Sequence, residues 1–247
     1  MRDFCPACRS ENIAYAFTKS GYDLFKCAEC DFLFVHPFPS AEVIAQHYRD
    51  HYRGATSTFY PKAESRRWRA FWRSLKFLPY VYGKRVVDVG CGGGFMVEAF
   101  SRLGAEVCGV DISANSIAYA QNRYPKLKFF CEGLDDFRRR GMEFDFVFSS
   151  EVLEHLPGPD EFMELMARIV APRGYVYLSA PDAGHPKVPA DIQEWSDICP
   201  PEHLQFFNER NLAILFQRYG FTQHRREHHR TPAHSVFFRR DNRPPEK

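Results

Sequence analysis

The sequence lacks any hydrophobic run of membrane-spanning length. No window in its 247 residues approaches the roughly 18 uninterrupted apolar residues that a transmembrane helix needs. The N-terminal Met-Arg-Asp-Phe-Cys-Pro has no apolar stretch of the kind that signal peptides carry. We therefore expect a cytoplasmic protein without a membrane partner.

The sequence also has little net charge. Its formal charge of +2 is too small to indicate a nucleic-acid partner by bulk electrostatics. It has no internal repeat, and its hydrophobic and charged fractions of 45% and 26% are typical of globular proteins, which excludes a disordered or fibrous chain. At roughly 150 residues per domain, the length predicts one large domain, alone or with a small one.

A secreted disulfide framework is absent, although the chain has eight cysteines. Four of them form two Cys-x-x-Cys pairs, separated by residues 9–26. Each pair directs two thiolates at one point, so two pairs complete a tetrahedral zinc site, and a segment of about 40 residues needs such a staple to fold. Because all four ligand positions are filled, we expect structural zinc on Cys5, Cys8, Cys27 and Cys30.

Composition divides the chain into four segments. We expect a zinc ribbon over 1–40, a helical linker or lid over 41–82, an α/β domain over 83–240 and a frayed tail over 241–247. In the third segment, apolar runs alternate with amphipathic helical patterns, which indicates βαβ units and a mostly parallel sheet. In the linker, the helical spacing of Trp68, Phe71 and Trp72 predicts that these side chains are buried against the sheet.

The central motif is Arg85-Val-Val-Asp-Val-Gly-Cys-Gly-Gly-Gly-Phe95. A strand there runs into a glycine loop, which lets the backbone turn tightly and a ligand approach closely, although a turn in an unliganded sheet is the alternative. Phe95 occupies the third position of the dinucleotide fingerprint, and Asp88 would repel a pyrophosphate. This carboxylate suits a ligand with an ammonium group and no phosphate, such as S-adenosylmethionine. Asp111 ends the next strand, where an acid can accept both ribose hydroxyls.

These motifs resemble class I, Rossmann-like S-adenosylmethionine-dependent methyltransferases over residues 83–240, together with Phe144-Asp-Phe-Val-Phe-Ser-Ser-Glu-Val-Leu-Glu-His-Leu156 and Ala171-Pro-Arg-Gly-Tyr-Val-Tyr-Leu178. The resemblance implies a seven-stranded sheet of order 3-2-1-4-5-7-6, with the last strand antiparallel and helices on both faces. It implies that the glycine loop holds the methionine end of the cofactor, Asp111 the ribose and residues 132–135 the adenine edge. The residues implied to bind the cofactor are Asp88, Gly90, Cys91, Gly92, Gly94, Phe95, Asp111, Ile112, Leu134, Asp135 and Ser149.

A second constellation follows the fourth strand of this domain. If Glu151-Val-Leu-Glu-His155 is helical, two carboxylates and an imidazole share one face, as divalent-metal sites require. The stretch resembles the Glu-x-x-Glu-His of plant small-RNA 2′-O-methyltransferases and ubiquinone-pathway O-methyltransferases. In the former, a downstream histidine completes a magnesium site, and His203 is its counterpart here. The alternative is that Glu151 and Glu154 line the cofactor pocket or cap a helix, and that His155 is a packing residue.

The sequence therefore predicts an S-adenosylmethionine-dependent methyltransferase. We expect the acceptor to be a small molecule or a glycan or secondary-metabolite precursor, methylated on oxygen, because the front of the chain resembles bacterial enzymes of such pathways. His155 and His203 are the candidate bases, with Glu151 and Glu154 as metal ligands or orienting groups. Two rivals remain, an RNA-modifying methyltransferase whose ribbon grips RNA and a catalytically idle binding module. The sequence does not indicate an oligomeric state.

Overall fold

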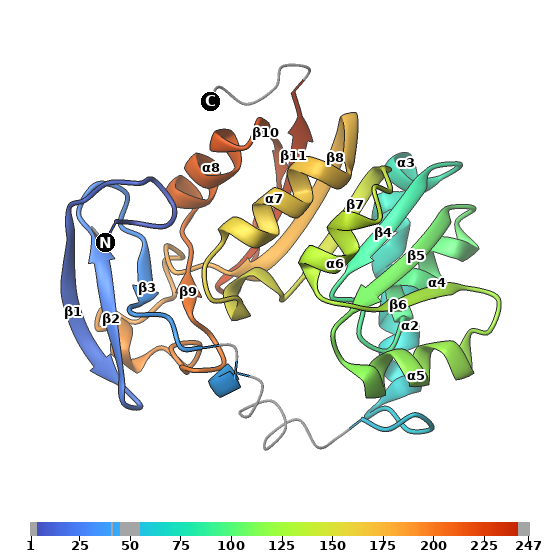
Figure 1. Ribbon diagram of the computed structural model, residues 1–247, viewed down its shortest axis with the longest axis horizontal. Helices are drawn as coiled ribbons and strands as arrows, with labels where there is room; N and C mark the ends of the chain where they lie inside the picture. Colours follow the sequence, from blue (N-terminus) through green and yellow to red (C-terminus); the bar gives the residue numbers. More distant parts are fainter. Residues whose placement is uncertain (1–3, 41, 45–54, 242–247) are drawn as a thin grey trace.

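The computed structural model describes residues 4–40, 42–44 and 55–241. A small sheet formed largely by the N-terminal segment lies beside a large sheet flanked by helices, at the left and right of Figure 1. Residues 41 and 45–54 of the predicted helical linker and residues 242–247 of the predicted tail lie outside the described residues. Within the ranges given above, no helix is both long enough and apolar enough to span a bilayer.

The large sheet has seven strands in the order β10-β11-β8-β7-β4-β5-β6. β4 pairs in parallel with β5 and β7, whereas β11 is antiparallel to both of its neighbours. Counted along the chain from β4, this order is 3-2-1-4-5-7-6, which confirms the predicted Rossmann-like topology. Its strands are β4 (Arg85–Val89), β5 (Glu106–Asp111), β6 (Lys128–Cys131), β7 (Phe144–Ser150), β8 (Val170–Pro181), β10 (Phe221–Arg226) and β11 (Ala233–Arg240).

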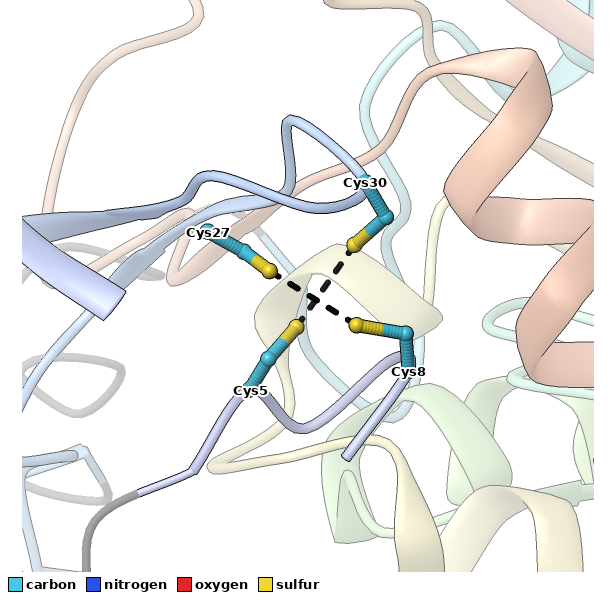
Figure 2. Close-up of side chains that lie close together, drawn as sticks. All are labelled: Cys5, Cys8, Cys27 and Cys30. Atoms are coloured by element: carbon cyan, nitrogen blue, oxygen red, sulfur yellow. Dashed lines mark hydrogen bonds between the residues drawn. The ribbon is translucent and has the colours of Figure 1, made fainter. Parts of the chain in front are cut away.

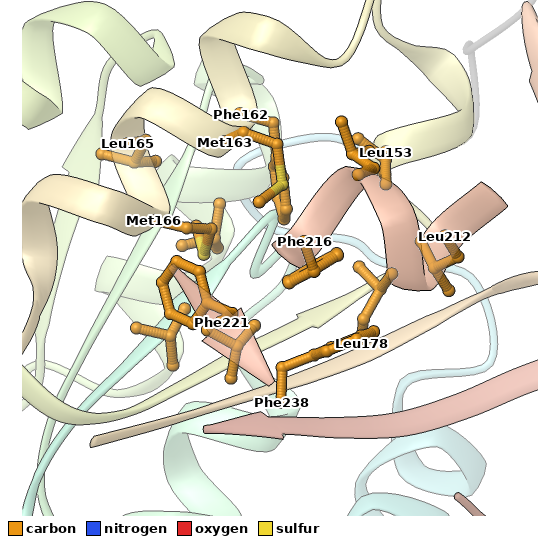
Figure 3. Close-up of a cluster of buried hydrophobic side chains, with 14 of the residues drawn as sticks. Leu153, Phe162, Met163, Leu165, Met166, Leu178, Leu212, Phe216, Phe221 and Phe238 are labelled. Carbon is orange, nitrogen blue, oxygen red and sulfur yellow. The ribbon is translucent and has the colours of Figure 1, made fainter. Parts of the chain in front are cut away.

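Helices cover both faces of this sheet because its central strands are apolar on both sides. In β4, Val87 and Val89 face one hydrophobic cluster, and Val86 faces the other. Figure 3 shows the first cluster, where the helix pair α7 and α8 packs over β8 and β11. The helices are α2 (Ala63–Ser74), α3 (Leu78–Val81), α4 (Phe95–Arg102), α5 (Ala114–Arg123), α6 (Leu134–Arg139), α7 (Asp160–Ile169) and α8 (Glu209–Arg218), with short 3₁₀ turns η1 (Leu75–Phe77), η2 (Leu153–His155) and η3 (Ile192–Glu194).

Helix α2 and the turn η1 dock on the second face through Phe77, which is fully buried. Its ring lies 4.7 Å from the ring of Tyr177 and 5.4 Å from that of Phe148, both edge-to-face. The prediction for the tryptophans of α2 is wrong, since Trp68 and Trp72 are 64% and 55% exposed. Small side chains at Ala70 and Ser74 are buried instead, so the helix packs closely through its narrow side.

The small sheet has the order β1-β2-β3-β9. Its first three strands, β1 (Ile13–Lys19), β2 (Tyr22–Cys27) and β3 (Leu33–Val35), come from the N-terminal segment. The fourth, β9 (Gln205–Phe206), comes from the α/β domain and pairs antiparallel with β3. The ribbon and the α/β domain therefore share a sheet, a connection that the sequence pattern did not indicate.

Candidate functional site

The four predicted zinc ligands converge in the N-terminal segment. Figure 2 shows their sulfurs pointing toward a common centre. The Sγ atoms of Cys5 and Cys30 are 3.7 Å apart, and those of Cys8 and Cys27 are 3.6 Å apart. A tetrahedral zinc with bonds of about 2.3 Å requires sulfur–sulfur distances of about 3.8 Å. A hydrogen bond from Cys30 lowers the pKa of the Cys5 thiol to about 5, which favours the thiolate that a metal needs. The donor set and its spacing therefore fit zinc.

The glycine loop lies at the carboxyl end of β4. Gly90 and Gly92 have φ of +78° and +49°, conformations that favour glycine. The Asp111 carboxylate accepts the Gly92 and Ser113 N–H groups at 2.8 Å each, so the end of β5 fixes the loop. A Cβ atom at Gly90 would collide with Cγ2 of Val152, which shows that the segment after β7 touches this loop.

Two buried acids, Asp88 and Asp111, lie at the glycine loop, where a bound cation would compensate their negative charge. Burial, with a smaller effect of the nearby Asp111 carboxylate, raises the pKa of Asp88 to about 8, although Arg73 acts in the opposite direction. Burial also raises the pKa of Asp111, while its hydrogen bonds from the Ser113 and Gly92 N–H groups lower it. A ligand ammonium beside Asp88 would restore the carboxylate by compensating the charge that burial disfavours.

Arg73 lies at the candidate site, although the sequence pattern did not indicate it. It lies on α2, and its guanidinium donates to Ser150 Oγ at 3.3 Å and Tyr177 Oη at 3.4 Å, above the ring of Phe148. These contacts place a cation at the carboxyl edge of the large sheet, near Asp88. An arginine between aromatic residues on a helix has the same sequence pattern whether it lies at a site or in solvent, so the sequence could not identify Arg73.

Tyr60 is a second residue that the sequence analysis did not single out. Its hydroxyl lies 2.9 Å from the position that a Cβ at Gly92 would take. The ring packs against Phe95 and Tyr119, with centroid distances of 5.3 Å each. The segment before α2 therefore covers the glycine loop.

The other predicted cofactor residues lie around the same sheet edge. Ile112 is 81% exposed directly after β5. Ser149 is fully buried at the end of β7, and its Oγ has no hydrogen-bond partner among the described residues. Leu134 begins α6, and the Asp135 carboxylate on the same helix forms ion pairs with Arg138 and Arg139. Three further residues lie in the loop or helix α4 that follow β4: Cys91 and Phe95 with buried side chains, and Gly94 at the N-cap of α4.

Of the four residues predicted to converge, Glu154, His155 and His203 form one group, and Glu151 is not part of it. One potential ligand atom from each lies within 4.8 Å of the others, and the two imidazole centroids are 4.8 Å apart. Glu154 and His155 are in the 3₁₀ turn η2 rather than an α-helix. Glu151 precedes that turn with φ +58°, and its carboxylate accepts a hydrogen bond from Ser179 Oγ at 3.1 Å.

The Glu154 carboxyl group is 1% exposed and lies deep in this cluster. No described residue donates a hydrogen bond to either of its oxygens. Burial raises its pKa well above the ordinary value, and the neighbouring Glu151 carboxylate adds to this. A hydrogen bond between the Glu151 and Glu154 carboxyl groups requires that one of them is protonated. A buried carboxyl group without a donor needs a proton or a cation.

Backbone carbonyls orient both histidines. His155 Nδ1 lies 2.7 Å from the Glu202 carbonyl oxygen, and His203 Nδ1 lies 3.0 Å from that of Asp197. A carbonyl only accepts, so each Nδ1 carries a proton, and in the neutral imidazole Nε2 then carries the lone pair. Metal-ligating histidines are typically fixed in this way. Burial, with a smaller effect of His203, lowers the pKa of His155 to about 4, so it is neutral at physiological pH.

Comparisons with known proteins give one family. Residues 60–225, more than half of the chain, match the family described as "Methyltransferase domain". A curated relative, the ubiquinone biosynthesis O-methyltransferase of Bradyrhizobium sp. (strain ORS 278), is 29% identical over 170 residues, covering 62% of this chain and 67% of the relative. A second, from Coxiella burnetii (strain Dugway 5J108-111), is 35% identical over 101 residues, or 39% of this chain. That alignment spans only 43% of the Coxiella protein's own length.

Solved structures support the same fold. The magnesium protoporphyrin IX methyltransferase of Synechocystis PCC 6803, with bound SAH, has a TM-score of 0.60 at 17% identity, over 81% of this chain and all of that one. An S-adenosylmethionine-dependent methyltransferase from Mesorhizobium loti has a TM-score of 0.56 at 21% identity, over 69% of this chain and 98% of that one. Since the family match includes the glycine loop, Asp111 and the η2 turn, this chain belongs to the methyltransferase-domain family and is an S-adenosylmethionine-dependent methyltransferase.

Proposed function

We propose that this enzyme methylates a hydroxyl group of a small molecule. The observation that carries the proposal is the convergence of Glu154, His155 and His203, because a hydroxyl acceptor must lose a proton. The segment after β7 that holds Glu154 and His155 also contacts the glycine loop, through Val152 at Gly90. The names of the curated relatives, which are O-methyltransferases of ubiquinone biosynthesis, support the same chemistry. Within this class, we propose a glycan or secondary-metabolite precursor as the acceptor, on the resemblance of the front of the chain.

S-adenosylmethionine supplies an activated methyl group when it is bound. We propose that Asp88 accepts its ammonium group and that Arg73 faces its carboxylate, since these two charges lie at the same sheet edge. Asp111 accepts from the ribose, and Ile112 flanks the adenine. The side chains and the glycine loop thereby fix the methyl group in line with the acceptor oxygen, and this positioning supplies most of the rate enhancement.

The remaining requirement is a proton acceptor. As the oxygen–methyl bond forms and the sulfur–methyl bond breaks, the hydroxyl proton passes to a base, and Nε2 of His155 or His203 carries the lone pair for it. The donor set also fits a divalent ion, because the buried Glu154 carboxyl group has no donor among the described residues. Magnesium or another divalent ion held by Glu154, His155 and His203, with Glu151 near it, would lower the pKa of the hydroxyl.

The charges on the ribbon do not favour RNA as the acceptor. Among residues 4–40, Arg9 is paired with Asp160, Lys26 with Asp31, and Lys19 donates to the Gln193 carbonyl group. A ribbon that grips RNA needs basic side chains directed at phosphates.

The test is transfer of a labelled methyl group from S-adenosylmethionine into cell extracts separated into RNA and small-molecule fractions. We expect label in the small-molecule fraction, with loss in Glu154→Gln and His203→Ala variants that still bind S-adenosylhomocysteine. Label found only in RNA would overturn the proposed acceptor. Chelator treatment separates the two deprotonation routes, because only the metal route loses activity on chelation and regains it when magnesium is restored.

A further inference from the structure

The two halves of the Glu154–His155–His203 site come from segments that are far apart in the chain. Glu154 and His155 are in η2, which is a single 3₁₀ turn, and His203 lies in the loop before β9. A single turn does not maintain its geometry by its own hydrogen bonds, because the conformational entropy lost in ordering its backbone exceeds the free energy gained from one hydrogen bond. Contacts from elsewhere must therefore hold the two halves together.

Those contacts come from Leu204 and Gln205. The side-chain amide of Gln205 donates to the carbonyl groups of Leu153 and Leu156, at 3.0 and 2.9 Å, on either side of Glu154 and His155. The Leu204 N–H donates to the Glu154 carbonyl at 2.8 Å. Three hydrogen bonds thus join the strand after His203 to the turn.

Gln205 is only 1% exposed, and its Oε1 has no hydrogen-bond partner among the described residues. Burying an amide oxygen without a donor is unfavourable, so an apolar residue would suit this position better unless the NH₂ group were needed. The opposite amide orientation would direct Oε1 at two carbonyl oxygens, so the donor assignment is secure.

The ribbon holds Gln205 in place. β9 has only two residues, and its partner is β3, with Phe34 opposite Gln205 and Leu33 opposite Phe206. The Val35 N–H donates to the Leu204 carbonyl at 2.9 Å. Ribbon and α/β-domain side chains also share one hydrophobic cluster, which includes Leu24, Leu33, Val35, Trp195, Ile198, Leu204 and Phe206.

The ribbon is tied to the α/β domain at its cysteines as well. The side-chain amide of Asn211, in the first turn of α8, donates to the Cys30 carbonyl at 3.2 Å. At the other end of α8, Arg218 donates to the carbonyl groups of Pro6 and Ala7 at 2.8 and 2.7 Å. The four-cysteine centre thus fixes β3 against the domain.

We propose that Gln205 is a positioning residue of the methyl-transfer site, and that the ribbon holds it so that the η2 turn faces His203. The assignment rests on the proposed role of Glu154, His155 and His203. It gives the ribbon a function within the active site, where its third strand sets the geometry of residues that act on the acceptor.

The experiment compares Gln205→Met with Phe206→Leu in the full-length protein. The first variant removes the amide at similar volume, and the second loosens the packing of the same strand without touching the amide. The readout is the ¹⁵N spectrum of the imidazoles at neutral pH, with the His155 and His203 signals assigned from His→Gln variants. The His155 Nδ1 bond to Glu202 bridges the turn and the strand segment, whereas the His203 Nδ1 bond to Asp197 lies within one segment.

We expect Gln205→Met to change His155 from the Nδ1–H tautomer to a mixture of tautomers while His203 keeps its pattern. S-adenosylhomocysteine affinity should stay within twofold, and turnover at saturating cofactor should fall at least tenfold. Phe206→Leu should leave the His155 tautomer unchanged. An unchanged His155 signal in Gln205→Met, or the same change in both variants, would overturn the proposal.

A ribbon-side variant keeps the proposal testable if Gln205→Met has no cooperative melting transition. Val35→Pro removes the N–H that bonds to Leu204, and it should produce the same change at His155. A folded Val35→Pro protein with the wild-type His155 signal would overturn the proposal. A His155 change in an enzyme that methylates only RNA would leave the positioning role intact and reject the proposed acceptor.

Discussion

Replacing Asp88 with asparagine should stabilise the ligand-free enzyme at neutral pH. The folded pKa of about 8 lies above the ordinary value of 3.8, chiefly because of burial. The folded state therefore holds a proton that the unfolded state releases. The stability associated with this proton is complete below pH 4 and is lost as the pH rises from about 4 to 8. Asparagine does not ionise, so the variant avoids this loss.

The size of the effect follows from the same shift. About three pKa units separate 3.8 from pH 7, and each is worth about 1.36 kcal/mol, which sets an upper limit of about 4 kcal/mol. The buried amide has its own desolvation cost, so we expect about 2 kcal/mol. For a chain of this size, that raises Tm by about 4–8 °C at pH 7. The Tm difference should fall with falling pH and should be zero or negative at pH 4, where only the desolvation cost of the amide remains.

Thermal unfolding monitored by circular dichroism from pH 4 to 8, without ligand, measures this difference. Asp145→Asn is the matched control, because burial alone would raise the pKa of Asp145 but hydrogen bonds from Arg85 lower it below the ordinary value. That variant should be less stable than the wild type throughout pH 4–8, the opposite sign, because the Asp145 contribution is present above the ordinary pKa and is lost only at lower pH. Calorimetry with S-adenosylhomocysteine should show Asp88→Asn weakened by about 10- to 100-fold, since a hydrogen bond to a charged group contributes about 1.5–3 kcal/mol. A Tm difference that does not grow with pH would refute the reasoning about Asp88.

Three further outcomes are expected. Elemental analysis should find one zinc per chain in protein purified without chelator, and Cys27→Ser should lose the metal and lower the Tm; a zinc-free wild type would exclude the structural metal. Asp111→Ala should abolish detectable S-adenosylhomocysteine binding, because it removes both the ribose acceptor and the hydrogen bond to Gly92. Gly92→Val should do the same, because the φ of Gly92 is +49° and Tyr60 Oη lies 2.9 Å from the added Cβ. Unchanged calorimetric titrations in both variants would reject this cofactor site. Glu154→Gln and His203→Ala should lower kcat at least 100-fold with cofactor affinity unchanged; equal losses in both quantities would place these residues in cofactor binding instead.

The sequence alone determined the alternation of strands and helices and the grouping of the four cysteines. Apolar runs alternating with helical patterns specify a parallel sheet, because strands buried on both faces need apolar residues throughout, as in β4. Two Cys-x-x-Cys pairs predict a four-cysteine group because the spacing is local within each pair. Asp88 and Asp111 could be located for a similar reason, since parallel strands deliver their carboxyl ends to one edge of the sheet. Their proposed roles with the cofactor remain predictions.

Tertiary structure alone decided how the distant segments meet. The burial of Ala70 and Ser74 in place of Trp68 and Trp72 depends on how closely α2 approaches the sheet, which helical periodicity does not encode. Arg73 reaches the sheet edge for the same reason. The pairing of Gln205 with Phe34 joins two segments through backbone hydrogen bonds that any residue other than proline can form, so it leaves almost no sequence signal. Local patterns specify elements and local ligand sets, whereas contacts between distant segments depend on shape and backbone pairing across the whole fold.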